Sequence, residues 1–350
     1  MEKADLEKFS LAGLLPLELD VLLKKILSRP VPDFRSRQIC RWINKGAIAF
    51  FEMNNLPLSL REELQKKCTV FSSQVSDKTD DKYSTVKLQI TLKDNNKIEA
   101  VIIKDNKGRK TACISTQAGC SLSCTFCHTG SLGFKRNLLA QEMAEQFLHL
   151  KKEEPDITHI VIMGMGEPLL NLEELRKAVD FFTHKEGMGI SKKRITISTA
   201  GIADRIKELA DNGPNVRLAM SLVSARQAIR EKLMPIAKTY PLPLLRQNLE
   251  YYQGKLKSRI TLEMVLLKDI NTCEEEANAV QAFAASLDVL VNLIPWNPIS
   301  SAGTGKQILK TPSKNEIMQF AKLLEKRKIK VSLRMSKGCS ISGACGQLGS

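Results

Sequence analysis

The residues in this sequence best suited to chemistry are thiols. Four of the nine cysteines lie close together, with Cys113 followed by Cys120, Cys124 and Cys127 in a C-x3-C-x2-C run. Clustered thiols in a chain of this size indicate metal binding or catalysis rather than a disulfide framework. A structural zinc site normally closes with four ligands, usually as pairs of C-x2-C. Three thiolates on one tight loop are more typical of an iron–sulfur cube that keeps one iron open for a non-protein ligand.

A second set of polar residues follows the segments that we expect to be strands. Gly166 and Glu167 in GMGEP follow the second strand, Ser198 and Ser221 end the third and fourth, and Asn297 in IPWNP follows the sixth. Each residue alone is an ordinary turn or cap residue. Because chemistry gathers at the carboxyl ends of parallel strands, their joint placement predicts a site beside the cysteine loop. The Gly-rich backbone and the Glu167 carboxylate suit an amino-acid ammonium group.

The elements that must position these residues form a regular series from about residue 106. The expected strands are Thr111–Ser115, His159–Met163, Arg194–Ser198, Val216–Leu222, Arg259–Leu266 and Val289–Ile294. The expected helices lie near 138–152, 172–183, 202–211, 225–232, 242–253 and 273–286, followed by a helix at 314–328 and a strand near Val331–Arg334. Six strand–helix units predict an α/β fold with a parallel sheet and outer helices, either open or rolled into a partial barrel.

Four regions follow from this pattern. Residues 1–82 are expected to be a helical, basic accessory domain, and 83–105 alternate as a β extension. Residues 106–340 form the core, and 341–350 form a C-terminal segment. The stretch from Lys24 to Lys45 contains seven Lys or Arg residues and one acidic residue, Asp33. This run is either a solvated helix face or a surface that grips phosphates.

Composition sets the class of protein. The 350 residues carry 53 Lys and Arg against 38 Asp and Glu, a net charge of +15, with 43% hydrophobic residues. This composition is typical of a globular protein. The excess of positive charge favours a polyanionic partner such as nucleic acid. No apolar run approaches the roughly 18 residues of a membrane helix. The acidic N-terminus, broken by Gly and Pro, does not look like a signal peptide, so we expect a cytoplasmic protein without a membrane partner.

The chain resembles the RlmN/Cfr class of radical S-adenosylmethionine (SAM) RNA adenine methyltransferases from about residue 34 to 348. The C-x3-C-x2-C run, with Phe126 before its last cysteine, is the cluster motif of the radical SAM superfamily. The motifs specific to the class are FRSRQICRWI, NLPLSLREEL, GCSLSCTFCHTG, GFKRNL, MGMGEPLLN, KLMPI, NLIPWNP and the closing ACGQL. The resemblance implies the partial (β/α)6 barrel of radical SAM enzymes, a [4Fe–4S] cluster on Cys120, Cys124 and Cys127, and two SAM molecules per turnover.

The resemblance also implies roles for individual residues. Cys345 takes a methyl group from one SAM, and a second SAM is cleaved to the 5′-deoxyadenosyl radical, which activates that methyl group. The resulting carbon radical adds to an adenine carbon that is not nucleophilic. Cys113 then releases the product by forming a disulfide with Cys345, and Glu99 accepts a proton. The residues implied to contact SAM are Gly166, Glu167, Ser198, Ser221, Leu222, Val223 and Asn297.

Two positions depart from the class. Val223 stands where the class usually has His, and Cys339 precedes ACGQL where the class usually has an acidic pair. Each change has two interpretations: neutral drift, or a change in how the protein contacts its substrate. They leave open which RNA and which adenine carbon are modified.

The implied substrate is the peptidyl-transferase-centre adenosine of 23S rRNA, methylated at C2, with tRNA as a further target. The alternatives are methylation at C8 of the same adenosine, which confers antibiotic resistance, and methylation of another RNA. A rival of another class is a non-catalytic RNA-binding protein that holds zinc. A flavodoxin-type electron donor suits a low-potential cluster, and we expect a monomer.

Overall fold

A single large sheet organises the computed structural model, which describes residues 8–105, 108–299, 309–334 and 337–349. Ten strands of the described residues belong to it. From one edge to the other they are β14 (Val331–Leu333), β13 (Val289–Pro295), β12 (Ile260–Leu266), β11 (Arg217–Ser221), β10 (Ile195–Thr199), β9 (His159–Ile162), β6 (Lys110–Cys113), β5 (Lys97–Lys104), β4 (Val86–Thr91) and β3 (Gln74–Asp80).

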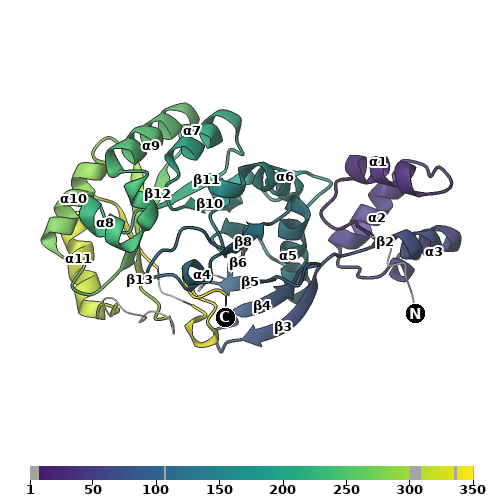
Figure 1. The fold of residues 1–350 in the computed structure, drawn as a ribbon, viewed down its shortest axis with the longest axis horizontal. Helices are drawn as coiled ribbons and strands as arrows, with labels where there is room; N and C mark the ends of the chain where they lie inside the picture. Colours follow the sequence, from purple (N-terminus) through teal and green to yellow (C-terminus); the bar gives the residue numbers. More distant parts are fainter. Residues whose placement is uncertain (1–7, 106–107, 300–308, 335–336, 350) are drawn as a thin grey trace.

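The part of the sheet from β6 to β14 is parallel: β6 pairs with β9, and from β9 to β14 each strand pairs with the next strand in sequence. Helices cross over between the strands and lie on the outside of the curved sheet (Figure 1). They are α5 (Ala140–Glu153), α6 (Leu172–Thr183), α7 (Ala203–Asn212), α8 (Gln227–Leu233), α9 (Leu242–Leu256), α10 (Glu274–Ala284) and α11 (Lys314–Lys326). The predicted α/β class with a partial barrel is confirmed. No helix among the described residues is long and apolar enough to cross a bilayer.

The antiparallel extension begins earlier than the sequence pattern indicated. β3, β4 and β5 pair antiparallel, and β5 pairs with β6. Residues 1–82 were expected to be helical, but β3 lies within them and is the edge strand of the large sheet. Its sequence, QVSDKTD, has almost no buried side chain and therefore no apolar alternation. Backbone pairing with β4 forms this strand, and its exposed charges discourage pairing with other chains.

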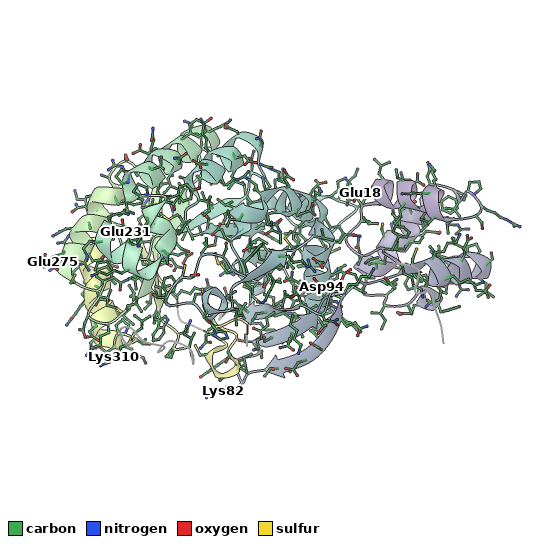
Figure 2. All side chains as sticks on the ribbon, viewed as in Figure 1. Glu18, Lys82, Asp94, Glu231, Glu275 and Lys310 are labelled. Atoms are coloured by element: carbon green, nitrogen blue, oxygen red, sulfur yellow. The ribbon has the colours of Figure 1, made fainter. Side chains whose placement is uncertain are left out.

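The N-terminal helices form a separate lobe at one end of the molecule (Figure 1). They are α1 (Pro16–Ile26), α2 (Phe34–Asn44) and α3 (Leu58–Lys67), and they bury Leu23, Ile39, Ile43 and Leu64. Two short strands, β1 (Phe9–Ser10) and β2 (Cys68–Thr69), close this lobe in parallel. Figure 2 shows Glu18 in this lobe, Glu231 and Glu275 at the opposite end, and Lys82 near the C-terminal segment.

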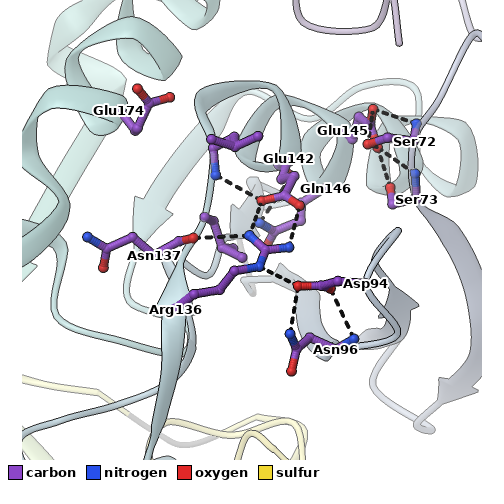
Figure 3. Close-up of polar contacts among 12 residues, drawn as sticks. Ser72, Ser73, Asp94, Asn96, Arg136, Asn137, Glu142, Glu145, Gln146 and Glu174 are labelled. Atoms are coloured by element: carbon purple, nitrogen blue, oxygen red, sulfur yellow. Dashed lines mark hydrogen bonds and ion pairs between the residues drawn. The ribbon is translucent and has the colours of Figure 1, made fainter. Parts of the chain in front are cut away.

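A polar cluster on α5 attaches the lobe to the core (Figure 3). The buried carboxylate of Glu145 accepts hydrogen bonds from Ser10 Oγ (2.8 Å), Ser72 N (2.8 Å) and Ser73 N (2.9 Å). One turn earlier, the Glu142 carboxylate accepts hydrogen bonds from both terminal nitrogens of Arg136, at 2.8 Å from Nη1 and 2.7 Å from Nη2. Because Glu145 satisfies several donors at once, it fixes the chain where the lobe ends and β3 begins.

We predict that Glu145→Gln destabilises the protein by about 2 kcal/mol, because an amide nitrogen then faces buried donors. Urea unfolding measures the loss, and limited proteolysis should show new cleavage close to Ser72. Glu153→Gln is the matched control on the same helix, since Glu153 pairs with the exposed Lys78 at 2.6 Å. Equal losses of stability in the two variants would contradict this role for Glu145.

Candidate active site and metal centre

The cysteine loop lies between β7 (Gln117–Gly119) and α4 (His128–Ser131), and β8 (Phe134–Asn137) pairs with β7. The loop can turn tightly because Gly119 has a φ of +75°. A Cβ at this position would lie 1.8 Å from the carbonyl oxygen of Gly133, so only glycine fits. The turn directs Cys120, Cys124 and Cys127 into one cavity at the carboxyl ends of the strands.

The three thiols are chemically suited to an iron–sulfur cluster. Burial raises the pKa of all three thiols: that of Cys120 to about 11, and that of Cys124 well above its usual value. The Cys127 thiol raises the pKa of Cys120 and of Cys124 further. A bound cationic cluster reverses this preference and makes them thiolates. Among the described residues no three Cys, His, Asp or Glu side chains converge as ligands of one metal ion. Three thiols from one loop, each of which can bind a separate iron, suit a cluster that keeps one iron open for another ligand.

The GMGEP segment forms the wall opposite the cysteines. Gly166 has a φ of +98°, and a Cβ there would lie 2.5 Å from the Gln117 Cβ. The carboxylate of Glu167 is buried and accepts hydrogen bonds from Ala200 N at 2.7 Å and Leu169 N at 3.0 Å. Burial raises its pKa to about 6, and these hydrogen bonds oppose the shift. At neutral pH the side chain is an anion suited to an ammonium group.

The structure brings together most, but not all, of the residues predicted to contact SAM. Gly166, Glu167, Ser198, Ser221 and Asn297 all line the cavity with the three cysteines.

Leu222 and Val223 are not among the described lining residues of this cavity. Both side chains are fully buried, and both backbone N–H groups donate to the carbonyl oxygen of Glu263, at 3.0 and 3.2 Å. Val223 adopts a φ of +60°, which is a strained conformation for a β-branched residue. Its carbonyl accepts a hydrogen bond from Asn271 Nδ2 at 2.7 Å. The side chain at position 223 therefore serves packing rather than the cavity surface.

The C-terminal segment places Cys345 over the cysteine loop. His128 N donates to the Gly346 carbonyl at 2.7 Å, and Thr129 Oγ1 donates to the Leu348 carbonyl at 2.7 Å. On the other side, Asn297 Nδ2 donates to the Cys345 carbonyl at 2.9 Å. Cys345 is exposed and lines the cavity.

Cys339, one of the two residues that depart from the class, bonds to the other polar atom of the Asn297 side-chain amide. Its Sγ donates to Asn297 Oδ1 at 3.1 Å. Both polar atoms of Asn297 are therefore engaged by the C-terminal segment. In this arrangement Asn297 fixes the segment that carries Cys345.

Cys113 and Cys345 lie close enough to influence each other. Burial raises the pKa of Cys113 to about 12, the Cys345 thiol adds to the rise, and Arg334 opposes it. The protein around the Cys345 thiol also raises its pKa by desolvation, although the residue as a whole keeps exposed surface, and Arg334 again opposes the rise. Cys113 is the last residue of β6, and Arg334 follows β14, so the two ends of the parallel sheet contribute to one site. Arg334 is the group that favours thiolates here.

The side chain of Glu99 contacts the end of the C-terminal segment rather than the cavity surface. It is buried on β5, pairs with Lys87 Nζ at 3.1 Å and accepts a hydrogen bond from Gly349 N at 2.7 Å. It is not among the described residues that line the cavity. Glu99 thus contacts the segment four residues after Cys345.

Sequence reasoning missed Glu263 and Arg334, which both line the cavity. Glu263 is buried and accepts a hydrogen bond from Asn292 Nδ2 at 2.7 Å, and burial raises its pKa while Arg334 lowers it. A carboxylate inside the apolar strand ITLEMVL is a signal that could have revealed Glu263. Arg334 ends the last expected strand, so the rule that selected Ser198 would have selected it as well.

Comparison with protein families assigns this arrangement to a class. The Radical SAM superfamily model matches residues 114–279, and the model of the ribosomal RNA large subunit methyltransferase N-terminal domain matches residues 12–70. A crystal structure of a radical SAM methyltransferase from Sphaerobacter thermophilus superposes with a TM-score of 0.90 at 33% identity, covering 97% of this chain and 99% of that one. The fold and the cysteine loop are those of a radical SAM methyltransferase, an enzyme class that uses a [4Fe–4S] cluster and SAM.

Comparison with curated proteins narrows the class. A Treponema denticola protein named probable dual-specificity RNA methyltransferase RlmN is 45% identical over 345 residues, covering 98% of this chain and 96% of that protein. A protein of the same name from Thermotoga neapolitana is 40% identical over 339 residues, covering 96% and 97%. The chain belongs to the RlmN family of radical SAM RNA methyltransferases.

We predict that SAM binding weakens as the pH falls through about 6, because Glu167 is protonated there and loses its attraction for the SAM ammonium. Glu167→Gln should bind SAM about 10- to 100-fold more weakly at neutral pH, with a flatter pH profile. Equilibrium dialysis of anaerobic, cluster-loaded protein measures both effects. Glu174→Gln is the control, since Glu174 pairs with exposed Lys177 on α6. A wild-type affinity that is constant across this pH range would contradict the assignment.

Proposed function

We propose that this enzyme methylates C2 of the peptidyl-transferase-centre adenosine of 23S rRNA, with an adenosine of tRNA as a second substrate. The observation that carries the proposal is the position of Cys345, which lines two different cavities. One is the cavity that contains the three cluster cysteines. The other lies on the opposite side of the same wall, and Met163, Glu263, Ile294 and Arg334 are shared by both.

The second cavity opens at the amino ends of the strands and has a basic rim. Arg109, Lys193, Arg194 and Arg217 are exposed residues that line it. His159 lines it as well, and its pKa is lowered by burial first and then by the positive charge of the three arginines. A positive rim around a path to Cys345 suits a nucleotide phosphate backbone, so an adenine extruded from folded RNA would reach the sulfur from this side.

The N-terminal lobe adds further positive surface. Lys25, Arg29, Arg41 and Lys45 are exposed, and none forms an ion pair within the described part of the chain. Arg37, by contrast, pairs with Glu186 at 3.2 Å. Cations without acidic partners are available for phosphates, so the lobe supports RNA binding outside the catalytic cavity.

The cysteines carry the protein's part of the reaction. Cys345, as a thiolate favoured by Arg334, attacks the methyl carbon of SAM, forms S-methylcysteine and displaces S-adenosylhomocysteine. When bound, the cluster and a second SAM supply the radical chemistry that joins this methyl carbon to the adenine. After the adduct has lost its C2 proton to a base and one electron, which the bound cluster would take up, Cys113 attacks the Cys345 sulfur as a thiolate. The sulfur–carbon bond breaks with its electron pair on the product carbon, and that carbon takes up a proton. The resulting disulfide is reduced by external thiol.

Glu99 has a place in this proposal that depends on the C-terminal segment. Its carboxylate holds Gly349 N and Lys87 in the structure. For Glu99 to accept a proton from the substrate, the bond to Gly349 must open during the cycle. The same movement would carry Cys345 between the methyl donor and the RNA.

The decisive experiment incubates anaerobically reconstituted protein with SAM, a reductant and protein-free 23S rRNA, followed by mass spectrometry of the nucleosides. We expect 2-methyladenosine, and none from the Cys345→Ser variant. Finding 8-methyladenosine instead would assign the C8 reaction, and no methyladenosine from protein with an intact cluster and methylated Cys345 would mean that another RNA is the substrate. Zinc in place of iron and sulfide would support the non-catalytic alternative.

We predict that Cys113→Ala accumulates protein covalently bound to RNA, because no thiol remains to attack the Cys345 sulfur. Denaturing gel electrophoresis after a single turnover measures the adduct, which nuclease should shorten. Cys273→Ala is the control, since Cys273 precedes α10 and lines neither cavity in the described residues. Release of free methylated RNA by the Cys113 variant would contradict the role.

The remaining partners stay predictions. A flavodoxin-type donor would supply electrons to a low-potential cluster, the enzyme would act as a monomer, and an RNA target of this kind would place it in the cytoplasm.

A further inference from the structure

Arg230 on α8 is a fully buried cation that the reaction described above does not use. It is among the largest fully buried side chains, with 0% of its surface exposed. Its Nη2 donates to the Ala200 carbonyl at 2.6 Å and its Nε to the Leu222 carbonyl at 3.2 Å. Its Nη1 is buried and has no hydrogen-bond partner in the described structure. No carboxylate of the described residues forms an ion pair with this guanidinium.

A buried charge without a counter-ion is strongly unfavourable, so its presence needs a partner. Arg226, one turn earlier, shows the ordinary arrangement in this protein: its Nε donates to the Glu276 carboxylate at 2.9 Å. Arg230 has only backbone carbonyls, which neutralise no charge. The missing partner must therefore be an anion close to the guanidinium.

The only titratable group with a marked electrostatic effect on Arg230, among the described residues, is a cluster cysteine. Burial lowers the pKa of Arg230 to about 10, and Cys124 opposes this shift. Arg230 in turn lowers the pKa of Cys124 against a larger rise from burial. The cysteine loop is also tied to the end of α8, because Thr125 N donates to the Leu233 carbonyl at 3.0 Å.

We infer that Arg230 is the buried counter-cation of the iron–sulfur cluster and a positioning residue for its loop. Three thiolates outweigh the positive charge of the oxidised cluster core, and one-electron reduction adds another negative charge. A guanidinium that is held by the Ala200 and Leu222 carbonyls and interacts electrostatically with Cys124 stabilises both states, and the reduced state more. Charge and hydrogen bonding near the sulfurs are known determinants of cluster potential. The inference rests on cluster binding and is independent of the RNA substrate.

The test uses full-length Arg230→Gln, which keeps hydrogen-bonding capacity but removes the charge. Anaerobically reconstituted protein without SAM is titrated with dithionite while the reduced cluster is followed by electron paramagnetic resonance. We expect the one-electron reduction equilibrium to fall at least tenfold, a shift of about 59 mV toward more negative potential. Arg230→Lys, which restores the charge, should recover most of the shift. Arg226→Gln is the control, because it removes an arginine–carboxylate ion pair one turn earlier, and it should leave the potential unchanged.

Thermal melting of the cluster-free protein separates this role from a purely structural one. Without the cluster the guanidinium lacks a counter-ion, so we expect cluster-free Arg230→Gln to melt at or above the wild-type temperature. A folded variant that no longer assembles four irons per chain would also support the inference. Two results would overturn it: an unchanged potential in the loaded variant, or a cluster-free variant that melts well below wild type or fails to fold.

Discussion

The structure depends above all on the hydrogen bonds that hold the C-terminal segment against the cysteine loop. His128 N and the Gly346 carbonyl join the two segments directly, and Asn297 and Glu99 hold the segment on either side of Cys345. These are contacts to backbone atoms, so they fix a path for the chain without demanding a particular side chain. The sheet supplies the partners because its strand ends converge at this point. Without this path, Cys345 would have no fixed position relative to the cluster.

The site is also an arrangement of buried charge that is balanced only when its ligands are bound. Thiols with raised pKa values and the Glu167 carboxylate line one cavity, and the guanidinium of Arg230, which has no acidic partner among the described residues, is buried against the carbonyl of Ala200, another lining residue. Each is unfavourable alone in a medium of low polarity. A cluster that converts the thiols to thiolates and a SAM ammonium beside Glu167 would satisfy all three at once. Cofactor binding should thus add substantially to the stability of the core.

The parts of the site that could be predicted from sequence are those set by local spacing or by strand ends. The C-x3-C-x2-C loop and Gly166 need only a few consecutive residues, and Ser198 and Ser221 follow from one rule about parallel strands. β3 escaped detection because backbone pairing, not apolar alternation, forms it.

Long-range partnerships could not be predicted in the same way. Glu99 had to be placed in the folded chain before its bond to Gly349 became visible. Arg230 gives no signal at all, because a single Arg in the helical segment QAIREKL has the pattern of an ordinary surface helix. Its burial arises only when α8 packs against the ends of β10 and β11, where Ala200 and Leu222 offer their carbonyls.

In the proposed reaction, the wall shared by the two cavities would allow one thiol to serve two large partners. SAM and a nucleotide cannot occupy the same space, and exchanging them in one cavity would expose any reactive intermediate to water. Cys345 in the wall faces the cofactor cavity on one side and the basic cavity on the other. Glu263 and Arg334 line both cavities, so these two charged residues border the sulfur on either side. In the proposed reaction, a methyl group carried on this sulfur would cross between the partners by a small movement of the C-terminal segment, whose position is set by hydrogen bonds to its backbone.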